Sequence, residues 1–268
     1  MRSKINSLEV KDCLEYIKEI EDESVTLCFT SPPYNVKLDY SDYNDDLKYK
    51  QYLNWLKDIF IETKRVLRDG GRLVINIDAI TNIEDEDADK TEYVRNIYTD
   101  LSIIMRDIKM KFRGEHAWFK QNTPGKKTAW GSWKSCSNPI ITRNHEYVLV
   151  WCKDNWKLPR VSEDSDLTKE EFMEYVRSAW EVVPQTKKKA DHPAAFPEEL
   201  AKRVIKLHSY PGDIVLDPFM GTGTTAVVAK RYKRNYLGCD ISEKYIKFAK
   251  ERINCESQFT NLDSLFNC

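Results

Sequence analysis

Short apolar runs at intervals along this chain predict buried strands. The clearest is residues 25–29 (Val-Thr-Leu-Cys-Phe), which is rich in β-branched and aromatic side chains and is soon followed by two prolines. Further strands are predicted at residues 73–77, 115–119, 146–151, 214–216 and 236–239.

Amphipathic stretches between these runs predict helices. Apolar residues from Leu53 to Leu67 recur at spacings of three and four, and the following Gly70-Gly71 is typical of a helix end. Similar patterns predict helices over residues 8–20, 94–108, 197–207 and 224–233, and one around residues 246–253. Helices that alternate with short strands predict an α/β fold with a doubly wound, largely parallel sheet.

Composition narrows the class of protein. The chain has 268 residues, of which 41% are hydrophobic and 32% charged, and we expect a single domain over residues 1–268. No stretch reaches the ~18 apolar residues of a membrane span, and the N-terminus has no signal-peptide pattern. The seven cysteines lack a CxxC pair, which favours reduced thiols and a cytoplasmic location.

The segment at residues 30–35 (Thr-Ser-Pro-Pro-Tyr-Asn) follows the first strand. Two consecutive prolines end a strand abruptly, because neither has an N–H and both fix φ near −65°. The expected result is a stiff corner in which the Ser31 hydroxyl and nearby carbonyls accept hydrogen bonds beside the ring of Tyr34. Such a corner suits a planar ring that bears an amino group. The alternative is a turn that only ends the strand.

A glycine-containing loop lies at residues 217–223, between a predicted strand and a predicted helix. Gly221, Gly223 and Ala226 fit the pattern G-x-G-x-x-G/A, and Asp240 ends the next strand 17 residues after Gly223. This pattern indicates a nucleoside cofactor without separating NAD from S-adenosylmethionine, and a tight turn without a ligand is the alternative. In a doubly wound sheet the loop and the proline corner can meet at the carboxyl ends of adjacent strands.

The charge of the chain is unevenly distributed. The net charge is −1, but residues 111–160 contain ten basic and three acidic residues, a local charge of +7. Trp and His residues are interleaved with these charges, which suits a polyanion with flat bases. Residues 120–145 are therefore a candidate DNA-contacting insertion, and the polar residues 154–190, which end in three lysines at 187–189, are a second candidate. The alternative is a basic loop offset by the acidic run at residues 84–87.

The proline corner and the glycine loop together (residues 30–35 and 217–225) resemble the S-adenosylmethionine-dependent amino-methyltransferases of DNA. The order of the two motifs is similar to that in the permuted β group, and the resemblance extends over roughly residues 8–253. It implies a Rossmann-like methyltransferase fold with circularly permuted motifs. It also implies transfer of a methyl group from S-adenosylmethionine to a flipped base in double-stranded DNA. Ser-Pro-Pro-Tyr favours cytosine N4 as the acceptor, with adenine N6 as the alternative.

The resemblance assigns roles to individual residues. The catalytic corner is Ser31, Pro32, Pro33 and Tyr34. The cofactor residues are Asp12, Cys13, Thr30, His192, Phe196, Asp217, Pro218, Phe219, Gly221, Gly223, Thr224, Thr225 and Asp240. The DNA-binding residues are Asn35, Lys126, Lys127, Trp130, Lys134 and Arg143. No metal is required.

The resemblance also bears on partners and on other functions. A cognate restriction endonuclease is a possible partner, and the protein is expected to be a monomer or homodimer. An NAD-dependent oxidoreductase would leave the corner and the basic segment without a role. An inactive DNA-binding relative is the other alternative. His116, His145, His192 and His208 are expected to be structural residues or phosphate contacts.

Overall fold

The computed structural model describes residues 4–34, 47–78, 81–84, 92–120, 136, 144–159, 164–184 and 196–265. Within these ranges, only the backbone is described for residues 81–84, 92–94 and 257–265. In the described part of the chain, no helix is long and apolar enough to cross a membrane.

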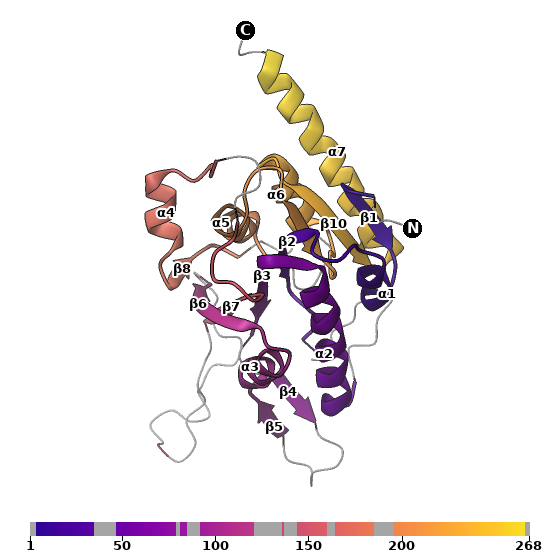
Figure 1. Cartoon of the computed structure of the whole chain (residues 1–268), viewed down its shortest axis with the longest axis vertical. Helices are drawn as coiled ribbons and strands as arrows, with labels where there is room; N and C mark the ends of the chain where they lie inside the picture. Colours follow the sequence, from indigo (N-terminus) through magenta and orange to yellow (C-terminus); the bar gives the residue numbers. More distant parts are fainter. Residues whose placement is uncertain are drawn as a thin grey trace.

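The strands and helices alternate along the chain (Figure 1). The strands are β1 Ser7–Val10, β2 Val25–Thr30, β3 Leu67–Ile77, β4 Thr81–Glu84, β5 Glu92–Arg95, β6 Lys111–Phe119, β7 His145–Cys152, β8 Ala179–Glu181, β9 Ile214–Asp217 and β10 Asn235–Asp240. The helices are α1 Cys13–Lys18, α2 Tyr49–Val66, α3 Ile97–Asp107, α4 Lys169–Tyr175, α5 Glu198–His208, α6 Thr224–Arg231 and α7 Glu243–Leu265.

The main sheet of the described chain has eight strands in the order β1-β10-β9-β2-β3-β7-β6-β8. Only β7 runs antiparallel to its neighbours β3 and β6, while the other pairings in this sheet are parallel. The prediction of a doubly wound, largely parallel sheet is therefore confirmed. Strand β9, from the last third of the chain, lies directly beside β2 from the first (Figure 1).

Helices cover both faces of this sheet. One hydrophobic cluster joins α1, α2 and α3 to one face, and a second joins α5, α6 and α7 to the other. Along β2, Cys28 belongs to the first cluster, whereas Leu27 and Phe29 belong to the second. Every residue of β2 is buried, which explains why this strand is a continuous apolar run rather than an alternating one.

Two predicted helices begin too early in the sequence. Residues 8–10 lie in β1, an edge strand paired with β10, and the helix begins only after Asp12. The Asp12 carboxylate accepts hydrogen bonds from the N–H groups of Leu14 and Glu15, which is an N-cap. Val94 likewise belongs to β5, and Asn96 caps α3 at the residue before it starts. The caps, rather than the apolar spacing, set these boundaries.

The predicted glycine end of α2 is also wrong. The helix ends at Val66, and Leu67 is already extended as the first residue of β3. Gly70 lies within this long strand with φ of +70°, where a Cβ atom would come within 2.1 Å of the Lys157 carbonyl oxygen. The glycine is needed for this close approach of two backbones and not as a helix cap.

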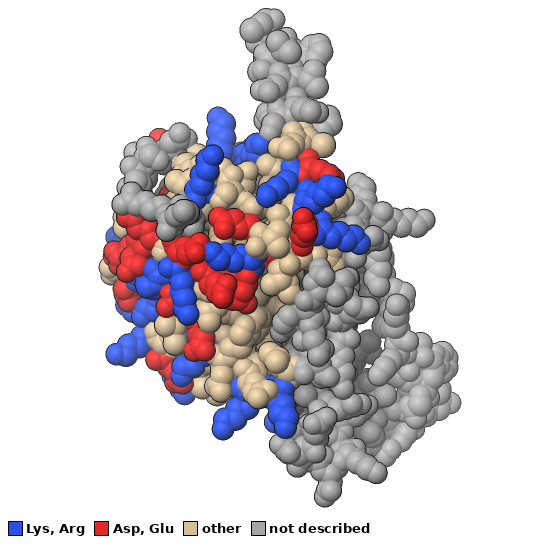
Figure 2. Space-filling model, turned by 90° about the vertical axis from the view of Figure 1, so that its right-hand side faces the viewer, with Lys and Arg blue, Asp and Glu red and all other residues tan. Residues whose placement is uncertain are grey.

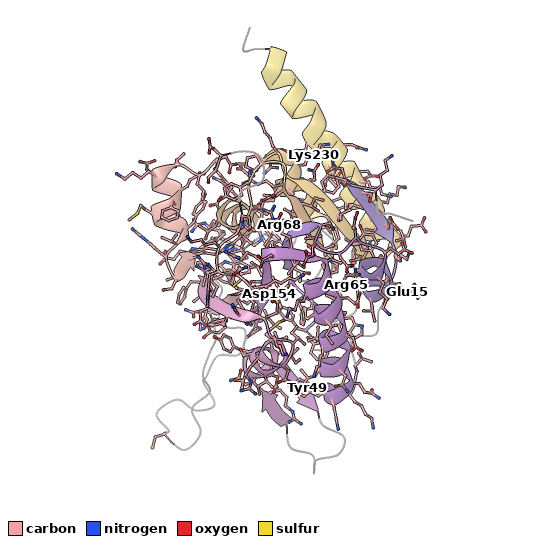
Figure 3. All side chains as sticks on the ribbon, viewed as in Figure 1. Glu15, Tyr49, Arg65, Arg68, Asp154 and Lys230 are labelled. Atoms are coloured by element: carbon pink, nitrogen blue, oxygen red, sulfur yellow. The ribbon has the colours of Figure 1, made fainter. Side chains whose placement is uncertain are left out.

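Helices α1 and α2 are joined by Arg65 (Figure 3). Its guanidinium donates hydrogen bonds to the carbonyl oxygens of Ile17 and Ile20, at 2.9 and 3.0 Å. Carbonyl groups at a helix C-terminus lack partners within the helix, so these bonds satisfy the end of α1. The residues before β2 are thereby fixed against α2.

Candidate active site

The carboxyl ends of β2 and β9 are joined by a buried carboxylate. Asp217, the last residue of β9, accepts hydrogen bonds from the hydroxyls of Thr30 (2.7 Å) and Thr225 (2.6 Å). The N–H of Phe219 donates to it as well, at 3.1 Å. Burial raises the pKa of Asp217 from its ordinary value of 3.8 to about 6, because the charged form is poorly solvated there. Asp217 thus connects the end of one motif to the start of the other.

The glycine loop is held by Asp240, at the end of β10. The N–H of Gly221 donates to one carboxylate oxygen and the N–H of Ser242 donates to the other, both at 2.9 Å. Gly223 has φ of +84°, and a Cβ atom there would lie 2.6 Å from the Cβ of Ala249 on α7. Gly223 therefore allows both the turn into α6 and the close packing of α6 on α7.

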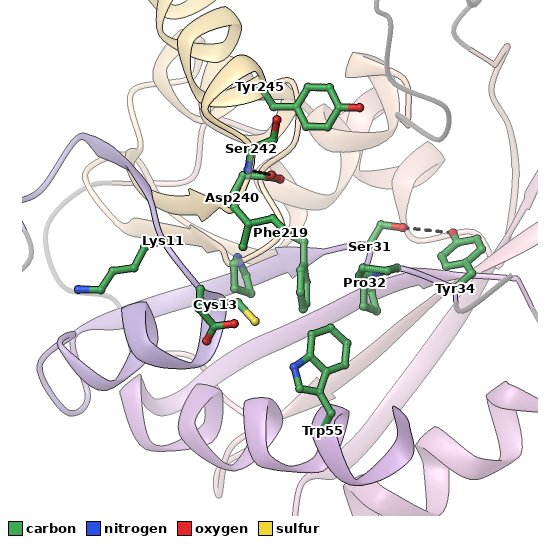
Figure 4. A pocket seen from close by; sticks show the side chains of 14 residues that line it. Lys11, Cys13, Ser31, Pro32, Tyr34, Trp55, Phe219, Asp240, Ser242 and Tyr245 are labelled. Atoms are coloured by element: carbon green, nitrogen blue, oxygen red, sulfur yellow. Dashed lines mark hydrogen bonds between the residues drawn. The ribbon is translucent and has the colours of Figure 1, made fainter. Parts of the chain in front are cut away.

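A pocket opens beside these strand ends (Figure 4). It is lined by residues from both motifs and from the chain between them: Lys11, Asp12, Cys13, Ser31, Pro32, Pro33, Tyr34, Trp55, Pro218, Phe219, Asp240, Ile241, Ser242 and Tyr245. Figure 4 shows Phe219 near the middle, with Asp240 on one side of it and Trp55 on another. The rings of Phe219 and Trp55 have centroids 5.5 Å apart.

Some predicted cofactor residues support the pocket without lining it. Thr30 and Thr225 hold Asp217, and the backbone of Gly221 holds Asp240. Phe196 lies in the core with its ring centroid 4.7 Å from that of Phe29. Further predicted residues outside the wall are Gly223, Thr224 and Asp217 itself. His192 lies outside the described residues.

Cys13 lines the pocket from the first turn of α1. Its burial raises the pKa of the thiol to about 12, so the thiol stays protonated at neutral pH. Cys13 thus contributes a small apolar surface and not a nucleophile. Among the described residues, no group of three His, Cys, Asp or Glu side chains is placed to hold a metal ion.

The proline corner is fixed by α2 and by two neighbouring strands. The hydroxyl of Tyr52 on α2 donates to the Pro33 carbonyl at 2.8 Å. The Ser31 hydroxyl donates to the Tyr34 hydroxyl at 3.2 Å, as the dashed line in Figure 4 shows. The Tyr34 hydroxyl in turn lies 3.3 Å from a carboxylate oxygen of Glu146, at the start of β7.

Several residues of this site are not predicted by the sequence motifs. Lys11, Trp55, Ile241, Ser242 and Tyr245 line the pocket, although none belongs to a motif. Trp55 lies on α2 three residues after Tyr52 and four before Ile59, so its spacing is that of a core residue and does not mark it as part of a pocket. Residues 241–245 follow directly after Asp240 at the start of α7, and this position after a cofactor strand is the clue that could have identified them.

The two histidines most deeply buried in the described chain are structural. The ring of His116 stacks on that of Trp180, with centroids 3.8 Å apart, and its Nδ1 lies 2.8 Å from the Arg177 carbonyl. His208 lies at the end of α5, and burial holds the pKa of its ring well below the ordinary range. Neither lines the pocket beside the corner.

The basic segment divides between surface and interior. Lys153 is buried and donates to the Leu67 carbonyl at 2.8 Å and to Glu23 at 3.1 Å. Lys120 forms an ion pair with Glu146. These two basic residues are therefore occupied within the fold. On the face drawn in Figure 2, basic and acidic side chains of described residues are interspersed.

The predicted DNA-binding residues lie outside the described residues: Asn35, Lys126, Lys127, Trp130, Lys134 and Arg143. The strands on either side of most of them are described. Strand β6 ends at Phe119 and β7 begins at His145, and these two residues pair with each other on the side of the sheet where β2 and β3 also end. The chain between them therefore leaves and re-enters the sheet on the side that carries the proline corner.

The segment at residues 154–190 contributes to the fold where it is described. Strand β8 pairs with β6 and forms an edge of the sheet. Helix α4 is held to α5 by ion pairs of Glu171 with Lys202 and Lys206 and of Glu174 with Arg203. A DNA-contacting role for this segment stays a prediction.

Residues 25–251 match a protein family described as DNA methylase, of the N6/N4 type. The chain belongs to this family. M.MjaVI, a type II methyltransferase from Methanocaldococcus jannaschii, is 35% identical over 173 residues, which cover 65% of this chain and 84% of that protein. DNA adenine methyltransferase YhdJ from Escherichia coli strain K12 is 27% identical over 270 residues, covering 93% of this chain and 83% of that protein.

A solved structure agrees with this assignment. TTHA0409 from Thermus thermophilus, complexed with S-adenosyl-L-methionine, has a TM-score of 0.75 and 30% identity, over 94% of each chain. The methylase is thus a DNA amino-methyltransferase of the cytosine-N4 or adenine-N6 type, and its cofactor is S-adenosylmethionine. The expected methyltransferase fold is confirmed, and the NAD-dependent alternative is wrong.

Proposed function

We propose that this methylase transfers a methyl group to N4 of a flipped cytosine in double-stranded DNA. The observation that carries the proposal is a single pocket lined by both the Ser31–Tyr34 corner and the loop around Asp240. A methyl donor and an amine acceptor have to meet within ~3 Å, and one continuous pocket permits this.

The chemistry of the pocket wall fits S-adenosylmethionine. Asp240 can accept hydrogen bonds from ribose hydroxyls, because a carboxylate oxygen accepts more than one hydrogen bond and this carboxylate lines the pocket. Phe219 and Ile241 offer apolar surface for a flat adenine ring. The wall carries two acidic residues, Asp12 and Asp240, and one basic residue, Lys11. This excess of negative charge suits a ligand that bears a positive sulfonium. When bound, the cofactor supplies a methyl group that is already activated for transfer.

The corner has to make a poor nucleophile reactive. The lone pair of an exocyclic amine is delocalised into the base, and two hydrogen-bond acceptors can localise it toward the methyl group. We assign these acceptors to the Ser31 hydroxyl and the Pro32 carbonyl, since the Pro33 carbonyl already accepts from Tyr52. Stabilising the positive charge that develops on nitrogen contributes on the order of a few kcal/mol.

The target amine lies inside the duplex, so the base must leave the stack before it reaches the corner. We assign stacking against the flipped base to the ring of Tyr34. In amino-methyltransferases of DNA the first residue of this corner is a serine or an aspartate, and serine is found mostly with cytosine N4 as the acceptor. Ser31 therefore favours cytosine over adenine. Adenine N6 is the alternative, and the relative YhdJ is named as an adenine methyltransferase. The similarity to type II methyltransferases supports a cognate restriction endonuclease as partner.

Nucleoside analysis tests the proposed function. The protein is incubated with mixed-sequence duplex DNA and isotopically labelled S-adenosylmethionine, and the digested nucleosides are identified by mass spectrometry. We expect labelled N4-methylcytosine, and Ser31→Ala should lower its formation by one or more orders of magnitude. Labelled N6-methyladenine would replace the base assignment and leave the corner in place. No labelled nucleoside in any duplex, despite cofactor binding, would indicate an inactive DNA-binding relative.

A further inference from the structure

A buried polar cluster lies directly behind the proline corner. It consists of Asn76 on β3, Glu146 on β7 and Lys120 just after β6, three adjacent strands of the sheet. Asn76 is 2% exposed and Glu146 8% exposed. Burying a carboxylate is costly unless it is paired, and this one is held by the Lys120 ammonium and by the Asn76 amide, at 2.7 Å from the latter.

The cluster contacts the catalytic corner through the hydroxyl of Tyr34. That hydroxyl lies 3.3 Å from the Glu146 carboxylate and 3.4 Å from the Asn76 backbone carbonyl, two groups that only accept hydrogen bonds. The amide nitrogen of Asn76 donates to the same carboxylate and, at 3.2 Å, to the Tyr34 hydroxyl. The carboxylate fixes this amide orientation, because an amide oxygen facing it would be repelled.

These contacts set the direction of the hydrogen bond between Ser31 and Tyr34. Two hydroxyls 3.2 Å apart can each donate to the other, so this pair alone has no defined direction. Tyr34 has one hydroxyl proton, and Glu146 draws it away from Ser31. The Tyr34 oxygen is then left as an acceptor, and Ser31 donates its own proton to it. The lone pairs of the Ser31 oxygen remain for another donor.

We propose that Glu146 is a positioning residue for methyl transfer, which acts through Tyr34 to present Ser31 as a hydrogen-bond acceptor to the target amine. The proposal rests on the proposed function, in which the Ser31 hydroxyl accepts from that amine. If the chain of hydrogen bonds were reversed, the Ser31 proton would point toward the amine and compete with its N–H groups. The role applies equally to cytosine N4 and adenine N6, because both present an amine.

The test is a pair of conservative variants and their combination. Glu146→Gln keeps the shape of the side chain but lets an amide N–H face Tyr34, and Tyr34→Phe removes the linking hydroxyl while keeping the ring. Single-turnover methyl transfer is measured with saturating duplex DNA and S-adenosylmethionine. We expect each variant to be at least 10-fold slower than wild type, and the double variant to be no slower than the slower single one. Cofactor affinity and melting temperature should stay near those of wild type.

The outcomes separate this role from a merely structural one. Losses that multiply in the double variant, or a Glu146→Gln rate near that of wild type, would overturn the proposal. If Glu146→Gln does not fold, Tyr34→Phe decides: a wild-type rate overturns the proposal, and a slow rate with an intact fold and cofactor affinity supports it. Failure of the proposed function is distinguishable, because the wild type would then transfer no methyl group to DNA.

Discussion

Some residues of this site have both a structural and an electrostatic role, and Asp217 is the clearest example. Asp217 is 1% exposed, and its carboxylate accepts hydrogen bonds from both Thr30 on β2 and Thr225 on α6. It is therefore both a conformational link and a buried titratable group. Hydroxyl and backbone donors lower the penalty of burying its charge but do not cancel it, which is why its pKa lies above 3.8, at about 6.

Asp217 should make stability depend on pH. Between about pH 4 and 6 the folded protein holds the Asp217 proton more tightly than the unfolded chain, so this residue stabilises the fold as pH falls through that window. The measured quantity is the free energy of unfolding of wild type minus that of Asp217→Asn. This difference should be larger at pH 4 than at pH 7, by up to ~3 kcal/mol. Urea unfolding of both proteins at several pH values measures this. A difference that does not change with pH would contradict it.

Asp240 is the residue whose loss should weaken cofactor binding most directly. Asp240→Ala removes a charged acceptor for ribose, the hydrogen bond that holds the glycine loop at Gly221, and the hydrogen bond from the Ser242 N–H. A charged hydrogen bond is worth roughly 1–3 kcal/mol, so the dissociation constant for S-adenosylmethionine should rise roughly 5- to 150-fold. Calorimetry measures this, with Glu243→Gln, an exposed acid three residues away, as the control. Equal affinity of Asp240→Ala and wild type would remove Asp240 from the site.

Elements act here by presenting residues from outside the motifs. Helix α2 belongs to neither motif, yet it contributes Trp55 to the pocket wall and Tyr52 to the Pro33 carbonyl. Strands β3 and β7 similarly contribute Asn76 and Glu146 behind the corner. The corner is rigid partly because two prolines restrict it and partly because three other elements hold it.

The hold of α2 on the corner can be tested with two matched tyrosines. Tyr52→Phe removes the hydrogen bond to the Pro33 carbonyl, and Tyr49→Phe, one turn earlier, removes a hydrogen bond to Asp100. Each should cost about 1 kcal/mol of stability in urea unfolding. Only Tyr52→Phe should also lower the single-turnover methyl-transfer rate, because only Tyr52 touches the corner. Equal rates for the two variants would show that α2 is not needed to position it.

At the scale of the whole molecule, the side of the sheet where the parallel strands end differs from the side where they begin. Strands β2, β3, β6 and β9 have their carboxyl ends on one side, where the corner, the glycine loop and the ends of the 120–144 connection lie. Lys111, Arg113 and Lys157 are exposed on the opposite side. A duplex that delivers its base to Ser31 is thus expected to contact the side of the carboxyl ends and not the opposite side.

Salt dependence of duplex binding tests this expectation. Substituting Lys126, Lys127 and Lys134 with alanine should weaken DNA binding and flatten its salt dependence, because each phosphate contact that is lost lowers the logarithmic slope by about 0.9. The same change at Lys111, Arg113 and Lys157 removes equal charge from the opposite side of the sheet and should leave the slope nearly unchanged. Fluorescence anisotropy over a series of salt concentrations measures the affinity and the slope for each variant. A larger effect of the change at Lys111, Arg113 and Lys157 would place the duplex on that side.

The sequence by itself determined the fold class and the two motifs, because both depend on local chemistry. Consecutive prolines end β2 wherever it lies, and glycines with Ala226 form a turn into α6 that packs closely on α7. The apolar spacing alone predicted wrong starts for α1 and α3 and a wrong end for α2. The caps at Asp12 and Asn96 and the pairing of β1 and β3 outweigh that spacing. Only the tertiary structure decided that Trp55, Asn76 and Glu146 belong to the site. Their positions depend on which strands become neighbours, and no spacing along the chain records that.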